Sequence, residues 1–492
     1  MPQRRTLICA TGLAPLAALA APIDELGPWL GDWRAVMRHG GEETPFGLHL
    51  EADKTRAGKL TVKVSAPVVH VWNAEVGRAV VQGERLVVND GAWVLSRSRD
   101  GVRLLGSTPE FLVPRLRLPL VFERGRLART ERPPPQLPEP AVHWRAQLEA
   151  PLWADLMASG DRLFAGDDAG RLRALDTASG RLIWQAQTGG ALRARPLLDA
   201  GELLVPSDDG ELHAFDAASG ASRWRLRLQA QAIERIPPGQ KGARFDRFGA
   251  AATVHGDLLL TASHAGRLAA WDRDTRRPRW ALDIGHSLLG TPVVTGELVL
   301  VGGFDGKLRA IELRSGRERW AFDTGEPVVS TVWVEGGLAI VGSRSYELFA
   351  VRLQDGREAW RRYHWFSWVE SAVNGLGDGR VFVGSSDGAH LSSLDAADGR
   401  LRWRADVGGW AWGQPALDAR QVAIGTAALG SYGVKHGAAI WSFERLQGRP
   451  RWRLPLPAPS AARNYGVTGS LALLGGRLFA GTLDGELLAL QV

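Results

Sequence analysis

A repeated segment that ends in tryptophan constrains the fold of this 492-residue chain more than any other feature. The clearest copy runs from Gly170 to Trp184 and reads Gly-x-Leu-x-Ala-Leu-Asp-x-x-x-Gly-x-x-x-Trp. Seven such segments end at Trp184, Trp224, Trp280, Trp320, Trp360, Trp403 and Trp452. Four of the six intervals are 40 or 43 residues, and the other two are 56 and 49. A period of this length indicates a repeat architecture in which each unit packs on the next.

Each repeat contains the pattern of four short strands. The stretch 170–176 alternates polar and apolar residues, 177–180 is a hairpin turn with a glycine, and 181–184 is an outer strand. Upstream, 163–166 forms another strand, and we expect Trp153–Met157 to be the innermost. Four strands in about 40 residues predict a propeller blade.

The number of blades follows from the two ends of the repeat region. Residues 478–492 supply the inner strands of a blade, but no turn and outer strand follow them. Residues 141–144 provide the missing strand, because Trp144 lies 40 residues before Trp184. A strand donated from early in the chain closes the ring and removes an exposed edge. We therefore predict an all-β fold with an eight-bladed β-propeller over 141–492, closed by strand 141–148.

Residues 22–128 lack the repeat and form a second predicted domain. Short alternating stretches such as 59–64 indicate strands, and 118–122 is the last of them, with Pro119 expected at a sheet edge. The opening Gly-x-Trp pattern at Gly27 resembles lipocalin-type domains. We expect a small antiparallel β-sandwich or a lipocalin-like partial barrel. A proline-rich linker, 129–140, joins it to the propeller.

The first 21 residues have the features of a signal peptide. Arg4 and Arg5 precede an apolar run that ends in Ala18-Leu19-Ala20, a small-x-small cleavage site. A run of about 15 apolar residues is too short to span a membrane. We expect an exported, periplasmic protein, by either the general or the twin-arginine route. The single cysteine, Cys9, falls within this segment, so the exported chain would have no disulfide and no cysteine ligand.

The distribution of the arginines and the spacing of the histidines argue against nucleic-acid binding and against a metal site. The formal net charge is +7, but the arginines recur in each repeat and do not cluster, which argues against nucleic-acid binding. No two histidines fall at metal-ligand intervals within one strand, and we expect no metal site. The Asp-Gly pairs at 208–210 and 385–388 are predicted to be hairpin turns.

The repeat resembles the tryptophan-docking repeat of the PQQ-like, or quinoprotein-type, β-propeller family, over about 141–492. The resemblance implies eight blades in which each terminal tryptophan packs against a neighbouring blade. The structural tryptophans would be Trp144, Trp184, Trp224, Trp280, Trp320, Trp360, Trp403 and Trp452. The departures are Glu312, Arg352 and Glu444 in place of the aspartate and Arg276 in place of the glycine, which suggest altered turns.

That family has a branch of dehydrogenases that bind PQQ and calcium, and a non-catalytic branch that includes a scaffold subunit of the outer-membrane assembly machinery. Many of the enzymes carry a disulfide of adjacent cysteines beneath the cofactor, which this chain cannot form. The chain therefore resembles the scaffold branch more, although it has an additional N-terminal domain and lacks a lipid-anchor cysteine.

We accordingly expect a non-catalytic periplasmic propeller, without a cofactor or catalytic residue. It would be a binding protein or an assembly scaffold for a protein, a peptide or a small ligand. The alternative is a dehydrogenase dependent on PQQ and calcium. For that activity the chain offers one set of residues at the channel mouth: Arg195, Glu370, Trp412 and Asn464.

Binding residues are sought at the channel mouth, where connections lead into the innermost strands. Blades six and seven are rich in aromatic residues there, and these could hold a ligand or pack between blades. Insertions at 230–247 and 428–435 mark binding surfaces or tolerated loop variation, and the first should cap the channel face. The candidate ligand-binding residues are Arg195, Trp365, Trp368, Glu370, Trp410, Trp412, Gln414, Asn464 and Tyr465.

Overall fold

The computed structural model describes residues 26–110, 116–128, 136–236, 241, 244–365, 367–429, 436–460 and 463–492. The expected signal peptide lies outside these residues, as does most of the expected linker. The chain divides between Pro135 and Gln136 into two compact units, which are described separately. The described residues form strands and two short 3₁₀ helices, η1 (Pro67–Val69) and η2 (Asn89–Gly91).

The N-terminal unit is a closed antiparallel barrel of eight strands in sequential order, with β8 paired back to β1. Its strands are β1 (Gly31–His39), β2 (Glu42–Ala52), β3 (Lys59–Ala66), β4 (Val71–Gln82), β5 (Arg85–Val88), β6 (Trp93–Arg97), β7 (Arg103–Ser107) and β8 (Pro119–Arg124). Phe46, Trp93 and Phe122 meet inside it, with ring centroids 6.0–6.4 Å apart.

Closure of this barrel corrects two expectations from the sequence. The strands form a full barrel and not a sandwich or partial barrel. Strand β8, which contains Pro119, pairs on both sides and so is not an edge. Pro119 is the first residue of β8, a position where the missing amide hydrogen costs little.

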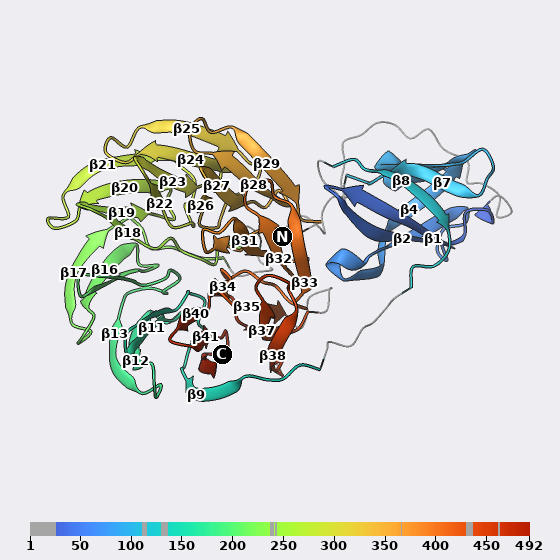
Figure 1. Cartoon of the computed structure of the whole chain (residues 1–492). Helices are drawn as coiled ribbons and strands as arrows, with labels where there is room; N and C mark the ends of the chain where they lie inside the picture. The colour runs from blue at the N-terminus through green and yellow to red at the C-terminus, as the bar shows by residue number, and fades with distance from the viewer. Residues whose placement is uncertain are drawn as a thin grey trace. The chain divides into compact units, whose positions relative to one another are not determined.

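The second unit consists of eight four-stranded sheets within its described residues, arranged round a ring (Figure 1). We number these blades 1 to 8 in chain order. Blade 1 comprises β10 (Met157–Ser159), β11 (Arg162–Gly166), β12 (Arg171–Asp176) and β13 (Leu182–Gln187); blade 2, β14 (Leu197–Asp199), β15 (Glu202–Pro206), β16 (Glu211–Asp216) and β17 (Ser222–Arg227); blade 3, β18 (Thr253–His255), β19 (Leu258–Ala262), β20 (Arg267–Asp272) and β21 (Pro278–Asp283); blade 4, β22 (Val293–Thr295), β23 (Leu298–Gly302), β24 (Lys307–Glu312) and β25 (Glu318–Asp323).

The second half of the ring follows the same plan. Blade 5 comprises β26 (Trp333–Glu335), β27 (Leu338–Gly342), β28 (Glu347–Arg352) and β29 (Glu358–Tyr363); blade 6, β30 (Asn374–Gly375), β31 (Arg380–Gly384), β32 (His390–Asp395) and β33 (Leu401–Asp406); blade 7, β34 (Ala416–Leu417), β35 (Gln421–Gly425), β37 (Ala438–Glu444) and β38 (Pro450–Leu456); blade 8, β40 (Ala472–Leu474), β41 (Arg477–Gly481), β42 (Glu486–Gln491) and β9 (Ala141–Gln147). A separate two-stranded sheet pairs β36 (Ala427–Leu429) with β39 (Asn464–Gly466).

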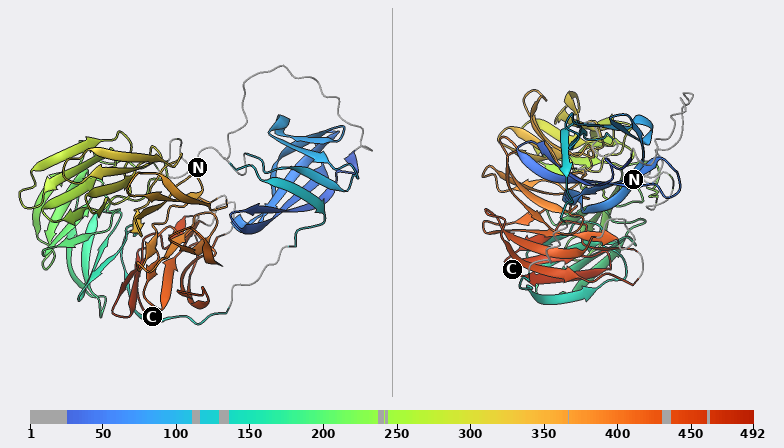
Figure 2. Two further views of the ribbon diagram at one scale, coloured as in Figure 1. Left: turned by 45° about the horizontal axis from the view of Figure 1, so that its top comes forward. Right: turned by 90° about the vertical axis from the view of Figure 1, so that its right-hand side faces the viewer.

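The predicted eight-bladed propeller is confirmed, including its closure by a strand from early in the chain. Strand β9 pairs antiparallel with β42, and Figure 2 shows the teal β9 beside the red strands of blade 8. One detail of the prediction is wrong, because the innermost strand of blade 1 starts at Met157, and Trp153 lies in the connection before it.

The core lies between adjacent blades. The second strand of each blade is almost wholly buried, as in Leu163–Gly166 of β11, because it is covered by a neighbouring blade on each face. The terminal tryptophans reach across to the next blade. Trp144 Nε1 donates to Thr177 O at 3.0 Å, and a Cβ added to Gly180 would meet that indole ring at 2.6 Å. Glycine is therefore required there both by contact and by a φ of +70°.

Candidate functional site at the channel mouth

The channel mouth is built from two kinds of segment at one end of the blades. Strands in a blade alternate in direction, so the turn between its second and third strands lies at the same end as the connection into the next blade. Trp153, Trp368 and Trp412 lie in connections that enter blades 1, 6 and 7. Asp208 and Arg344 lie in turns of blades 2 and 5.

The long connection between β17 and β18 crosses this mouth. Arg344 Nη1 donates to Arg244 O at 2.8 Å, and its Nη2 donates to Phe245 O at 3.0 Å. The Arg247 guanidinium lies 4.9 Å from the ring centroid of Trp153 and 5.6 Å from that of Trp412. Blades 1 and 5 are on opposite sides of an eight-membered ring, so the segment Arg244–Arg247 spans the channel. The prediction that this insertion caps the channel face is confirmed for its described residues.

Polar contacts hold the connection to blade 2 before the crossing segment and to blade 3 within it. Arg235 forms a two-pronged pair with Asp208, with Nε–Oδ2 at 2.6 Å and Nη2–Oδ1 at 2.7 Å. Asp246 Oδ2 lies 2.6 Å from His264 Nε2. A small pocket, partly open to solvent, lies beside these contacts and is lined by Asp208, Arg235 and His264 among others.

Glu370, the carboxylate nominated from the sequence, forms a buried ion pair. Its Oε1 lies 2.7 Å from both Nε and Nη2 of Arg344, and each side chain is 7% exposed. The Arg344 guanidinium also lies 4.6 Å from the Trp368 ring. The charge of Glu370 is therefore matched inside the protein.

Arg247 is a cation held mainly by aromatic rings. Besides Trp153 and Trp412, the Phe245 ring lies 5.6 Å from its guanidinium carbon. Its Nη1 is buried without a hydrogen-bond partner among the described residues. Burial lowers the pKa of Arg247 to about 10, and the charge of Glu370 opposes that shift.

A second ion pair beside Arg247 contains a carboxyl group with a perturbed pKa. Asp168 Oδ1 lies 2.9 Å from Arg193 Nε, and Arg193 Nη1 donates to Arg247 O at 3.2 Å. Burial raises the pKa of Asp168 to about 6, although the charge of Arg193 acts in the opposite direction. The mouth thus combines buried acidic and basic groups with aromatic faces.

The tryptophans nominated in blades 6 and 7 fall into two groups. Trp365 is 2% exposed and packs edge-on against Tyr363, so it belongs to the core. Trp410 stacks on Trp412 with centroids 4.9 Å apart, and these indoles donate to Asp387 and Ser386 respectively. Only Trp368 and Trp412 of the set contact the crossing segment among the described residues.

The other nominated residues do not join them in one site. Gln414 Nε2 donates to Val373 O at 2.9 Å, and Asn464 pairs with Leu429 in the two-stranded sheet. Tyr465 is 5% exposed and packs on Ala428 and Ala438, whereas Arg195 is exposed. Within the described residues, no hydrogen bond, ion pair or ring contact links any two of Arg195, Glu370, Trp412 and Asn464.

Sequence reasoning missed Arg247, Arg344 and Asp168. One signal could have found Arg344. Its turn reads Ser343-Arg344-Ser345-Tyr346, where blade 2 has Ser207-Asp208-Asp209-Gly210. An arginine in place of the acidic turn residue indicates that the turn has acquired another contact.

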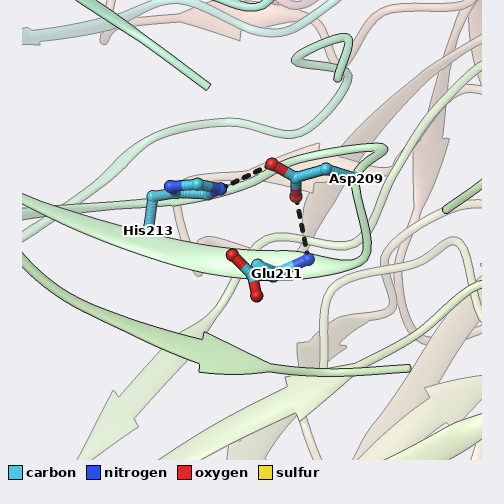
Figure 3. Close-up of side chains that lie close together, drawn as sticks. All are labelled: Asp209, Glu211 and His213. Atoms are coloured by element: carbon cyan, nitrogen blue, oxygen red, sulfur yellow. Dashed lines mark hydrogen bonds and ion pairs between the residues drawn. The ribbon is translucent and has the colours of Figure 1, made fainter. Parts of the chain in front are cut away.

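A cluster of possible metal ligands lies in blade 2. Side-chain ligand atoms of Asp209, Glu211 and His213 are all within 4.8 Å of one another, and Figure 3 shows Asp209 facing His213. The His213 ring is 1% exposed, and its Nε2 lies 2.8 Å from Asp209 Oδ2. Burial acts to raise the pKa of Asp209, but hydrogen bonds from the Glu211 amide and His213 outweigh it and lower the pKa.

Residues at equivalent positions in other blades form ion pairs with turn aspartates, which explains this cluster without a metal. Arg173 lies 2.7 Å from Asp167 in blade 1, and Arg309 lies 3.0 Å from Asp305 in blade 4. His213 occupies the position of these arginines. Glu211 is paired in turn with Arg227 at 3.0 Å. The three residues could hold a cation only by giving up these bonds, so we interpret His213 and Asp209 as a link that stabilises the turn.

Comparison with known proteins gives the family and the fold. A family model described as outer membrane protein assembly factor BamB matches residues 138–239, 236–364 and 360–492. The crystal structure of BamB from Moraxella catarrhalis has a TM-score of 0.54 at 18% identity, covering 72% of this chain and 100% of that one.

A second solved structure is that of the computationally designed Ika8 protein. Its TM-score is 0.56 at 14% identity, and the match covers 70% of this chain and 98% of that one. A search of curated proteins finds no match. No helix in the described part of the chain is long and apolar enough to cross a membrane.

Proposed function

Because the chain belongs to the family of the outer membrane protein assembly factor BamB, we propose that it is a non-catalytic periplasmic scaffold that binds a protein or peptide partner during assembly. The sequence prediction of a PQQ-like propeller closer to the scaffold branch than to the dehydrogenases is confirmed. The specific role and the location in the periplasm are parts of the proposal. The predicted signal peptide supports that location.

One observation carries the proposal over the enzyme alternative: the chain's own residues occupy the channel mouth. Arg247 lies over Trp412, the ring that would have to floor a quinone slot. Arg344 pairs with Glu370, the carboxylate that would have to act as a base. The residues present therefore do not fit a PQQ and calcium site in this arrangement, and the proposal includes no cofactor.

The assembly role is tested in the native cells. Deletion of the gene should lower the amounts of several outer-membrane β-barrel proteins, and a plasmid copy of the full chain should restore them. A tagged copy should fractionate with the periplasm and crosslink to a component of the assembly machinery. Unchanged outer-membrane proteins together with no such crosslink would reject the role.

The enzyme alternative is tested on the purified full chain. Incubation with PQQ and calcium should produce no quinone absorbance on the protein after gel filtration and no rise in Tm. Stoichiometric PQQ together with a Tm increase would overturn the non-catalytic assignment. A family dehydrogenase serves as the positive control for cofactor loading.

A further inference from the structure

The segment Arg244–Arg247 lies in the channel mouth as a bound peptide lies in its receptor. We propose that the mouth is a recognition site for peptides that carry an aromatic residue and an arginine two positions later, and that this segment occupies the site in cis. Such recognition is separate from the assembly role, because it would operate whichever machinery the propeller serves.

The first element of the receptor is an anchor for the peptide backbone. Arg344 donates to two consecutive carbonyl oxygens, those of Arg244 and Phe245, at 2.8 and 3.0 Å. These bonds depend on no peptide side chain. The ion pair with Glu370 fixes the orientation of the guanidinium, so the donors are in place before a peptide arrives.

The second element is a pair of aromatic subsites. Trp153 and Trp412 contact the guanidinium of Arg247, at 4.9 and 5.6 Å from their centroids. Trp368 receives the ring of Phe245 edge-on, with centroids 6.3 Å apart. Cation–π contacts are stronger when the pair is desolvated, as it is in this mouth. The two subsites therefore select for both side-chain types at a fixed spacing.

The receptor and its occupant come from different parts of the fold. Trp153, Arg344, Trp368 and Trp412 belong to short turns and connections of four blades, which regular strands hold in place. Arg244–Arg247 belongs to the connection of more than twenty residues between β17 and β18. Arg235 anchors that connection at blade 2 through Asp208. For the mouth to open, the crossing segment has to give up its contacts with Arg344, with His264 and with the guanidinium groups of Arg193 and Arg235.

The crossing segment is not an optimal ligand for the mouth, so a peptide that binds better can replace it. Arg247 Nη1 is buried without a hydrogen-bond partner among the described residues, which makes the cis contact less favourable. Burial also lowers the pKa of Arg247, so its charged form is held less well than in water. However, a tethered segment competes at an effective concentration on the order of millimolar. The intact protein should therefore bind free peptides weakly.

The test uses a free peptide with the sequence of residues 241–250 and a variant whose mouth is vacated. In the full chain, Arg244→Gly, Phe245→Ser, Asp246→Gly and Arg247→Ser keep the loop length but remove the occupant. Calorimetry should show that the peptide binds this variant at least about tenfold more tightly than the wild type. The matched control is Glu234→Gly with Ile236→Ser, two exposed residues of the same loop, which should bind like the wild type.

Two further measurements assign the subsites. Adding Trp412→Ala to the vacated variant should weaken binding at least about fivefold, consistent with loss of one cation–π contact. A peptide with alanine in place of Phe245 and Arg247 should not bind. Binding by the folded vacated variant that is no tighter than that of the wild type would overturn the proposal, and so would equal binding of the alanine peptide. If the quadruple variant does not fold, Phe245→Ser with Arg247→Ser empties both aromatic subsites and replaces it in the comparison.

Discussion

The guanidinium carbon of Arg276 lies 4.3 Å from the centroid of the Trp224 ring, at the turn position where Gly220 lies against Trp184. Trp224 Nε1 donates to Glu202 at 3.0 Å, whereas Trp184 donates to a backbone carbonyl of the next blade. Arg276 Nη2 is 3.2 Å from the same Glu202 oxygen. Between blades 2 and 3, Arg276 therefore takes the place of the turn glycine. Glu202 takes the place of the backbone carbonyl that accepts the indole hydrogen bond, and the two side chains form an ion pair.

We expect Arg276→Ala to destabilise the propeller by about 1–2 kcal/mol, because it removes the cation–π contact and leaves Glu202 with a weaker partner. Arg276→Gly should be nearer to wild type, because the φ of 58° at this position costs glycine nothing. Urea unfolding measures both. Equal stability of the alanine and glycine variants would contradict this account.

Gly356→Ala should destabilise by about 2–4 kcal/mol, because the new Cβ would meet the Trp320 ring at 2.7 Å at a φ of +71°. Gly336→Ala is the matched control. It has a similar φ of +59° and no atom within 4 Å, so only the conformational cost of about 1 kcal/mol remains. Comparable losses in the two unfolding curves would show that the tryptophan contact is unimportant.

Removal of β9 should open the ring. A chain that starts at residue 149 lacks β9 and Trp144, exposing the edge of β42 and the core around Phe479. A chain that starts at residue 137 keeps both. We expect the shorter chain to have a Tm lower by at least about 10 °C and to aggregate, as judged by scanning calorimetry and light scattering. Similar melting of the two chains would rule out closure as a source of stability.

Glu370→Ala should destabilise by about 3–5 kcal/mol, because it leaves the buried Arg344 charge without its partner. The double variant Glu370→Leu with Arg344→Met should recover much of that loss, since neither charge remains to be buried. Denaturant unfolding of both variants provides the measurement. A double variant less stable than Glu370→Ala would show that Arg344 is needed mainly for its bonds to the crossing segment.

His364 should make the propeller acid-sensitive. Burial lowers its pKa to about 3, and the charges of Arg362 and Arg404 act in the same direction. The unfolded chain therefore takes up a proton near pH 6.5, before the folded chain does. The contribution of neutral His364 to the free energy of unfolding is fully present above pH 6.5 and declines as the pH falls toward 3.

We expect His364→Gln to lose less stability than wild type between pH 7 and pH 4.5, because glutamine does not titrate. Urea unfolding across this range gives the difference at each pH. His255→Gln serves as a control, because His255 is exposed. Parallel curves for His364→Gln and wild type would exclude a role for this histidine.

The sequence predicts the architecture well because the repeat encodes it locally. Alternating residues define each strand, glycines fix the turns, and the distance from Trp144 to Trp184 reveals the closing strand. Closure of the barrel could not be predicted, because it depends on the pairing of β1 with β8, which are far apart in the sequence and carry no repeat. The prediction that Pro119 marks a sheet edge was wrong for the same reason. The sequence of one strand does not show which strands lie on either side of it.

The site was predicted less well than the fold. Aromatic density correctly pointed to Trp368 and Trp412, but composition could not separate them from the buried Trp365. Arg247 and Arg344 are about a hundred residues apart in the sequence, and only the path of the crossing segment brings them to one place. Contacts of this kind follow from the tertiary structure and leave no periodic pattern.

The pairing of β9 with β42 also sets an order of events during synthesis. Arg145 and Glu486 meet across 341 positions of sequence, so β9 is produced early and its partner only at the end. Blades 1 to 7 can form in succession as the chain emerges, because each uses neighbouring strands. The first-made strand of the propeller must wait unpaired until β42 is made, so ring closure cannot precede completion of the chain.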